Sequence, residues 1–194
     1  MKPFKRRRRG GICATFETGE AHMLANLSGQ VVELLRDRNG ISESEPDPLF
    51  DQVGLGGPLY PPEDPVLKRL LPDAYRDDPE DAAEFRRFTE QSLSASKVRN
   101  NEVMIGSLID GGLSFEDRDG ESTKQIEVEL DPEAVQAWLR SLTDIRLSLA
   151  IRLGIDNEED AMLVGSSEDE ATVAMAEIYD WLGYVQESLI AALD

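Results

Sequence analysis

The chain has a single cysteine, Cys13, and a single histidine, His22, among its 194 residues. One cysteine excludes an intramolecular disulfide and a cysteine-based zinc site, and it indicates a reducing compartment. His22 lies inside a predicted helix, which disfavours a serine–histidine–aspartate triad. One cysteine and one histidine cannot build a transition-metal site. We therefore predict no catalytic residues, no metal ligands and no cofactor.

Long apolar runs are also missing. No stretch approaches the 18 apolar residues expected of a membrane-spanning helix. Residues 1–30 contain no apolar signal core, so the arginine run near the start does not begin a signal peptide. We expect a cytoplasmic protein that makes no membrane contact. The 40% hydrophobic and 30% charged residues are sufficient for one globular domain with its own core.

Basic residues are scarce and unevenly placed. The chain has 20 Lys and Arg against 39 Asp and Glu, which gives a formal net charge of −19. The first ten positions hold no acid and six of the bases: Lys2, Lys5, Arg6, Arg7, Arg8 and Arg9. We interpret residues 1–10 as a basic N-terminal arm and residues 11–194 as a single acidic domain. The arm binds nucleic acid or an acidic partner, docks on the acidic domain, or has no role.

Apolar residues recur at helical spacing in four long stretches. These predict helices over residues 19–39, 78–110, 131–153 and 167–193. Asp78-Pro79 and Asp131-Pro132 are typical helix starts, and Ser167 with Glu170 has the pattern of a capping box. A shorter helix is predicted over residues 66–71. Residues 40–65 are rich in proline and glycine and are predicted to form a long loop.

Two short segments alternate between apolar and other residues, as half-buried strands do. They are residues 12–17 and 125–130. We expect them to pair with each other in a two-stranded antiparallel element, although a local hairpin through residues 117–120 is the alternative. The predicted fold is mainly α (α+β), a compact helical domain of about four main helices with this small β element.

Strand alternation places Cys13 on the face opposite Ile12, Ala14 and Phe16. If those three side chains face the core, the thiol points outward or toward an edge. Nearby arginines favour the thiolate form, which makes Cys13 a candidate redox residue. The alternative is a small strand residue without a role.

The predicted helix that begins at residue 131 is apolar around most of its circumference, which indicates burial. It nevertheless contains Asp144, Arg146 and Arg152. Buried charges are normally paired, so we expect a structural ion-pair network. Asp144 could reach Arg140 one turn earlier or an arginine from a neighbouring helix.

The stretch from Trp138 to Gly154 resembles the signature W-L-x-x-L-x-D-x-R-L-x-L-x-x-R-L-G of an actinobacterial family of unknown function, which includes the oxidative-stress transcriptional regulator AosR. The signature covers Trp138, Asp144, Arg146 and Arg152, and further similar segments extend the resemblance over nearly the whole chain. The resemblance implies redox-sensitive control of transcription through protein contacts. Because Cys13 is alone, such a switch requires a sulfenate or a disulfide with another molecule.

These observations favour a non-enzymatic regulatory or adaptor protein that acts through protein–protein contacts. Its expected partner is a protein such as part of the transcription machinery, and a homo-oligomer is a further option. The alternative is a nucleic-acid-associated regulator that uses only the basic arm. A second alternative is a carboxylate-dependent hydrolase, although no catalytic dyad can be selected from 39 acidic residues.

Overall fold

The structure, a computed structural model, describes residues 1–7, 10–40, 58–75, 77–114 and 124–193. Its elements are β1 (Lys2–Arg6), β2 (Ile12–Glu17), α1 (Thr18–Gly40), α3 (Pro65–Leu70), α4 (Pro79–Asp110), β3 (Gln125–Leu130), α5 (Pro132–Leu153), α6 (Glu158–Val164) and α7 (Glu170–Ala191). The predicted fold class is confirmed: mainly helical with a small antiparallel β element. In the described residues this sheet has three strands rather than the expected two.

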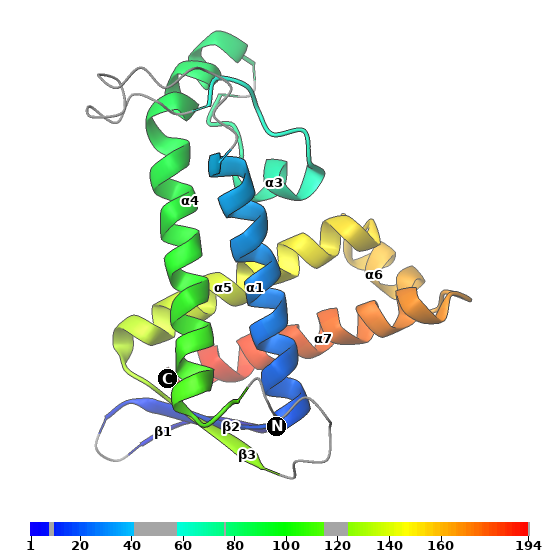
Figure 1. Cartoon of the computed structure of the whole chain (residues 1–194). Coiled ribbons are helices and arrows are strands. Elements are labelled where there is room, and N and C mark those ends of the chain that lie inside the picture. The colour runs from blue at the N-terminus through cyan, green and yellow to red at the C-terminus, as the bar shows by residue number, and fades with distance from the viewer. Residues whose placement is uncertain (8–9, 41–57, 76, 115–123, 194) are drawn as a thin grey trace.

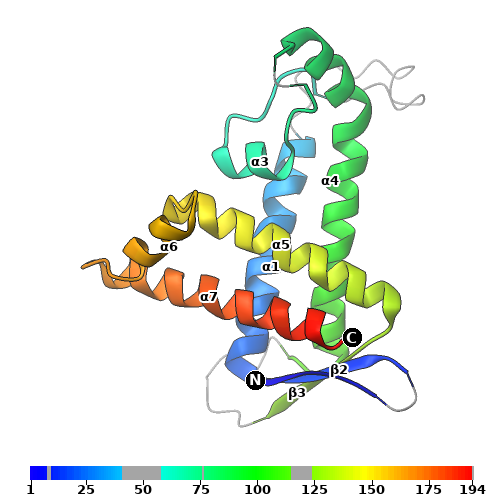
Figure 2. The same cartoon turned by 180° about the vertical axis from the view of Figure 1, so that it is seen from behind.

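The helices form two crossing pairs (Figure 1). α1 and α4 run side by side in opposite directions, with the sheet at one end of this pair and α3 near the other. α5 and α7 form the second pair and cross the first, as the view from behind shows (Figure 2). α6 connects them at the end that projects from the molecule. Among the described residues, no helix combines the length and apolarity needed to cross a membrane.

The sheet has the order β1-β2-β3, with both pairs antiparallel. Ile12 pairs with Leu130 and Phe16 with Ile126, so the two strands predicted from the sequence do pair with each other. Residues 117–120, which the alternative hairpin would have used, lie outside the described residues. Alternate side chains of β3 are buried, as its sequence alternation predicts.

Residues 2–6, assigned from the sequence to the basic arm, form the edge strand β1. Phe4 anchors the strand, because its ring packs edge-on against Phe16 and Trp138 with ring centroids 6.0 and 5.7 Å apart. Its backbone N–H also donates to Ser188 Oγ of α7 at 2.8 Å. The buried ring of Phe4 and the pairing of β1 with β2 therefore fix residues 2–6 in the sheet. The basic composition of the segment does not predict this strand. Arg8 and Arg9 lie outside the described residues.

The core is built around α5. Trp138, Leu142, Ile145 and Leu149 are buried along this helix, as predicted. From α7, Leu182 and Val185 are buried and Ile178 is partly buried against the same core. The helix begins where expected, because Asp131 accepts a hydrogen bond from the Ala134 backbone. It ends at Gly154, whose φ of +68° favours glycine.

Two helix boundaries differ from the sequence prediction. No helix was predicted between residues 153 and 167, but this stretch contains α6, whose start is closed by a capping box between Asn157 and Asp160. α7 begins after Asp169, which caps the Thr172 backbone, rather than at Ser167. A helix as short as α6 has too few turns to show apolar periodicity, so its caps are its main signal. Residues 41–57 of the predicted loop lie outside the described residues.

Candidate functional site: a groove along α4

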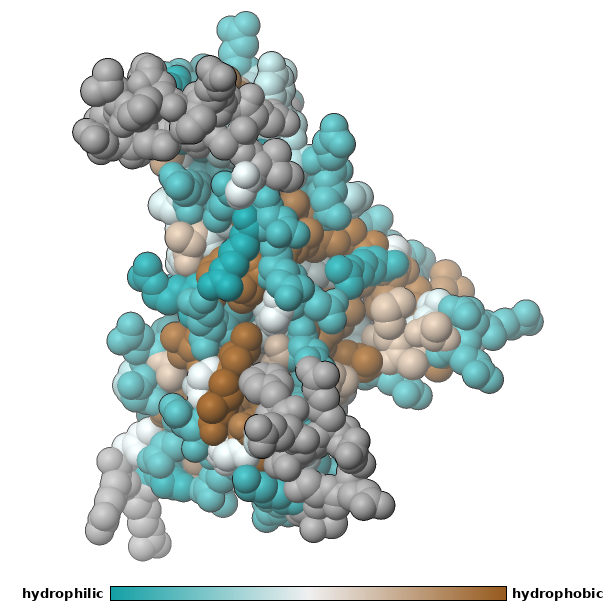
Figure 3. Space-filling view, viewed as in Figure 1, coloured by the Kyte–Doolittle hydropathy of each residue, from teal (hydrophilic) through white to brown (hydrophobic). Residues whose placement is uncertain are grey.

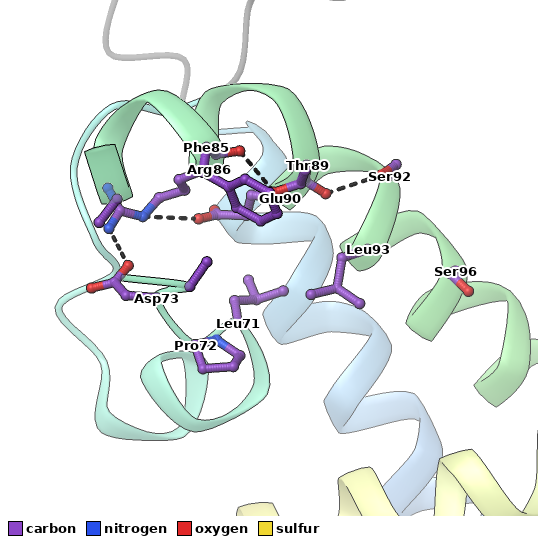
Figure 4. Close-up of a pocket in the computed structure, with 12 residues that line it drawn as sticks. Leu71, Pro72, Asp73, Phe85, Arg86, Thr89, Glu90, Ser92, Leu93 and Ser96 are labelled. Carbon is purple, nitrogen blue, oxygen red and sulfur yellow. Dashed lines mark hydrogen bonds and ion pairs between the residues drawn. The ribbon is translucent and has the colours of Figure 1, made fainter. Parts of the chain in front are cut away.

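Two hollows follow one face of α4. The first, about 400 Å³, lies between α4 and residues 71–74 (Figure 4). The second, about 570 Å³, lies between α4, α5 and α7. Leu93 and Ser96 line both hollows, so the two are adjacent along α4. We call the combined feature the α4 groove. Its α4 side is formed by Ala82, Phe85, Arg86, Thr89, Glu90, Ser92, Leu93, Ser96, Lys97 and Asn100.

Large apolar side chains of the groove are open to solvent. Phe85 is 45% exposed, Leu93 41% and Ile190 49%. Figure 4 shows Leu71 and Leu93 pointing toward each other below the ring of Phe85. Figure 3 shows the face of the molecule that is seen in Figure 1. Most of this face is hydrophilic, and its hydrophobic residues form areas that are separate from one another. Exposed apolar side chains gathered in a concave region are typical of a binding surface.

A buried ionic network supports the first hollow. Glu90 accepts from Arg38 Nε of α1 at 2.8 Å, and its other oxygen lies 3.7 Å from Arg86 Nε. Arg86 also pairs with Asp73. Arg38, Arg86 and Glu90 are all buried. The two guanidinium groups further donate to the backbone carbonyls of Tyr60 and Leu59. The network therefore holds residues 59–73 against α1 and α4.

One ion pair lies at the second hollow. Lys97 Nζ of α4 donates to Asp144 Oδ1 of α5 at 2.5 Å. Asp144 is buried, and its Oδ2 has no hydrogen-bond partner among the described residues. Burial raises the pKa of the Asp144 carboxyl, while the hydrogen bond and charge of Lys97 lower it by less. The ion pair with Lys97 thus offsets only part of the free-energy cost of burying the Asp144 carboxylate.

Arg140 lines the same hollow from α5. Its side chain is exposed, and within the described residues it forms no hydrogen bond or ion pair. The acids that line the groove, in contrast, are each paired with a base: Asp73 and Glu90 with arginines, Asp144 with Lys97. Among the residues that the structure describes, the uncompensated charge at the groove is therefore positive, although the chain as a whole carries −19.

The signature charges of α5 contact neighbouring elements. The sequence left Arg140 or an arginine of a neighbouring helix as the partner of Asp144, whereas the structure pairs Asp144 with a lysine of a neighbouring helix. Asp144 meets Lys97 of α4. Arg146 donates to Gln186 of α7 at 2.9 Å and lies 4.9 Å from the centre of the Tyr179 ring. Arg152 donates to Gln30 of α1 at 3.3 Å. Residues 144, 146 and 152 point to different sides of one helix, so each reaches a different neighbour.

The aromatic residue of the signature has a structural position. Trp138 is fully buried and stacks on Phe16 with ring centroids 5.9 Å apart. It also contacts Phe4, so it joins α5 to β1 and β2. Trp138 therefore positions the sheet against the helices.

Strand alternation places Cys13 on the face of the central strand opposite Phe16, and on that face Cys13 is buried. Its neighbours across the sheet are Lys5 and Glu129. A hydrogen bond to Cys13 and the charge of Glu129 raise the pKa of Arg7 above its usual value. Arg7 also pairs with Glu127 and Glu129. Long charged side chains of the neighbouring strands therefore cover the thiol.

Sequence reasoning missed the residues that shape the groove. Arg86 and Glu90 stand one helical turn apart, and this spacing was an available signal. Arg38 and Lys97 gave no such signal, because their partners lie 52 and 47 positions away in the chain. Pairing over such distances depends on how the helices pack.

Comparison with known proteins places the chain in a family. A family model described as "Domain of unknown function (DUF2017)" matches residues 1–193. The chain belongs to the DUF2017 family. This confirms the resemblance inferred from the signature around Trp138. No solved structure shows significant similarity to this DUF2017 chain.

Curated relatives of this DUF2017 chain come from mycobacteria. The proteins named "Oxidative stress regulator AosR" in Mycobacterium tuberculosis (strain ATCC 25618 / H37Rv) and Mycobacterium bovis (strain ATCC BAA-935 / AF2122/97) are 32% identical over 184 residues. The alignment covers 90% of this chain and 78% of each relative. A "Putative oxidative stress regulator AosR" of Mycobacterium leprae (strain TN) is 29% identical over 177 residues, with the same coverage.

Proposed function

We propose that this protein is a non-enzymatic regulator of the oxidative stress response that acts by binding another protein. The observation that carries the proposal is the α4 groove, where Phe85, Leu93 and Ile190 expose large apolar surfaces. The names of the mycobacterial relatives support the regulatory part of the proposal. Because exposed apolar surface is costly in water, a groove of this kind is best explained by a partner that covers it.

The state of the acids in the groove supports a binding role rather than catalysis. Asp73, Glu90 and Asp144 are each paired with a base. A general acid or base must be free to exchange its proton with a substrate, and an ion-paired carboxylate is poorly suited to that role. The hydrolase alternative is therefore disfavoured at this site.

The link to oxidation requires Cys13 to become accessible. Its thiol is buried, and Arg7, whose side chain interacts with it, is itself held by Glu127 and Glu129. We propose that an oxidant acts on Cys13 only when this cover opens, so that the response is slow without a partner or a local opening of β1.

The experiment is an affinity capture from actinobacterial extract, with and without peroxide, using the wild-type chain and Cys13→Ser. A regulator that works by protein contact retains a specific partner in stoichiometric amount, and a redox-linked one retains it differently after peroxide. The serine variant should lose this difference, because it has no thiol; a difference that persists in it would come from methionine oxidation instead. Failure to retain any partner under either condition contradicts the proposal.

The nucleic-acid alternative rests on Lys2, Lys5 and Arg6–Arg9. Its structural support is weaker, because Arg7 is already paired with two glutamates of β3. If it holds, the protein binds duplex DNA or RNA with an affinity that falls steeply with salt. Replacing Arg6–Arg9 by serine should then abolish the binding while leaving the Phe4 anchor of β1 in place.

A further inference from the structure

The α4 groove is long enough for a helix. Its α4 side extends from Ala82 to Asn100, which corresponds to about 27 Å at the helical rise of about 1.5 Å per residue. An α-helix of roughly 18 residues has this length. The groove has walls on its far side at both ends, formed by residues 71–74 and by α5 with α7. A peptide helix that lies in such a groove presents an apolar stripe at every third or fourth residue.

The charges at the groove restrict the occupant further. Arg140 is exposed at the rim of the second hollow, and it lacks a partner among the described residues. The groove acids Asp73, Glu90 and Asp144 are already compensated. A carboxylate on the occupant would therefore meet an available cation at Arg140, whereas a cation at that point would meet repulsion.

The rest of the molecule favours the opposite charge. With a net charge of −19, the protein attracts basic molecules over long range and repels acidic ones. An occupant that suits both the cation at Arg140 and the negative net charge of the protein has a carboxylate on the face toward the groove and a basic face toward solvent. A second copy of this chain is disfavoured as the occupant by the like charge that it would bring.

We propose that the α4 groove binds one amphipathic helix of a partner protein, whose apolar face carries a carboxylate that pairs with Arg140 and whose opposite face is basic. This inference rests on the proposed function, because it names the chemistry of the partner that the regulator contacts. Phe85 and Leu93 supply the apolar surface of the first hollow (Figure 4), and Ile190 supplies that of the second. Arg140 sets the register of the bound helix.

The test uses synthetic helical peptides of about 18 residues with leucine on one face and lysine on the other. Two peptides carry a glutamate within the leucine face, one in the first turn and one in the last, which covers both directions of binding. Two matched peptides carry lysine at the same positions. Fluorescence anisotropy measures the Kd of each peptide for the full-length protein and its variants.

We expect one of the glutamate peptides to bind about tenfold more tightly than its lysine counterpart. Arg140→Glu should reverse this preference, so that the lysine peptide now binds better. Leu93→Asp should weaken binding by about tenfold or more, because it places a charge at the junction of the two hollows. The control is Met162→Asp, since Met162 is 68% exposed on α6 and does not line the groove. It should leave the Kd unchanged.

Several outcomes overturn the inference. The inference fails if no peptide binds to the wild type, or if the glutamate and lysine peptides bind equally well. It also fails if Met162→Asp weakens peptide binding as much as Leu93→Asp does. A wild-type dimer in sedimentation that Leu93→Asp dissociates would identify a second copy as the occupant. Circular dichroism confirms that each variant is folded.

The affinity capture separates this inference from the proposed function. If a captured partner binds Leu93→Asp and Arg140→Glu as well as wild type, the regulator acts by contact but through another surface. If the peptides behave as expected but no partner is captured, the groove chemistry stands and the proposed function fails.

Discussion

Lys97 and Asp144 join α4 to α5 through a single hydrogen-bonded ion pair of 2.5 Å at the floor of the α4 groove. The carboxylate is more deeply buried than the ammonium group, with side chains 4% and 17% exposed. Burial of an ion is unfavourable, and a partner that is removed leaves that cost uncompensated. The pair therefore contributes to how α4 and α5 fit together more than to net stability.

The first prediction concerns this pair. Lys97→Met should destabilise the fold by about 3–5 kcal/mol, because it leaves the buried Asp144 carboxylate without its counter-charge. Lys97→Met combined with Asp144→Leu should recover most of this loss, since no buried charge then remains. Urea denaturation of the single and double variants measures the difference. A double variant as unstable as the single one would contradict this explanation.

The second prediction follows from the raised pKa of Asp144. Folding favours the protonated carboxyl, so its contribution to stability is complete below the ordinary aspartate pKa of about 3.9 and is lost as pH rises through the raised folded-state pKa. Asp144→Asn cannot titrate at this position. The stability of wild type relative to Asp144→Asn should therefore decrease with rising pH over that interval, as measured by urea denaturation across a pH series. A difference that increases with pH would mean that Lys97 outweighs burial.

The third prediction concerns the anchor of β1. Phe4→Ala should cost about 3–5 kcal/mol, because the ring packs against both Phe16 and Trp138 in the core. Lys5→Ala on the same strand should change stability by less than about 0.5 kcal/mol, since its side chain is exposed. Thermal unfolding followed by Trp fluorescence compares the two. Equal effects would indicate that β1 is not anchored through Phe4.

The fourth prediction uses two glycines of the α4 region as a matched pair. A Cβ at Gly111 would lie 2.7 Å from the Glu127 carbonyl oxygen of β3, so Gly111→Ala should cost about 1–3 kcal/mol. A Cβ at Gly106, within α4, meets nothing within 4 Å. Gly106→Ala should therefore stabilise the helix by about 0.5–1 kcal/mol. Calorimetric melting temperatures should move in opposite directions, and a parallel change would argue against the close α4–β3 contact.

The fifth prediction concerns the cover of Cys13. The native thiol should react with maleimide far more slowly than the thiol in urea, because it is buried. Arg7→Ala should accelerate labelling several-fold, because it removes a charged side chain that interacts with Cys13. Arg6→Ala is the control, since Arg6 reaches the Leu193 carbonyl at 3.4 Å instead. Rapid labelling of the native wild type would show that the cover is open in solution.

Most elements of the fold follow from the sequence alone. Asp131-Pro132 and Gly154 fix the ends of α5, because capping and backbone conformation act within a few residues. The apolar stripe of the same helix identifies its buried face, including Trp138 and Leu142, because burial follows from periodicity. The alternation of β2 also gives the orientation of Cys13 relative to Phe16.

Tertiary structure decides the rest, because it brings together residues that no local pattern connects. Cys13 interacts with Arg7 and pairs across the sheet with Glu129 of a strand far along the chain. The partner of Asp144 comes from α4, and not from the arginines of its own helix. The α4 groove exists only where α4 faces residues 71–74 on one side and α5 with α7 on the other. The sequence by itself thus determines which segments are helices or strands and which faces they bury, since these depend on short-range geometry. Ion-pair partners, covered thiols and grooves depend on how the helices cross, which is set by the packing of the whole core.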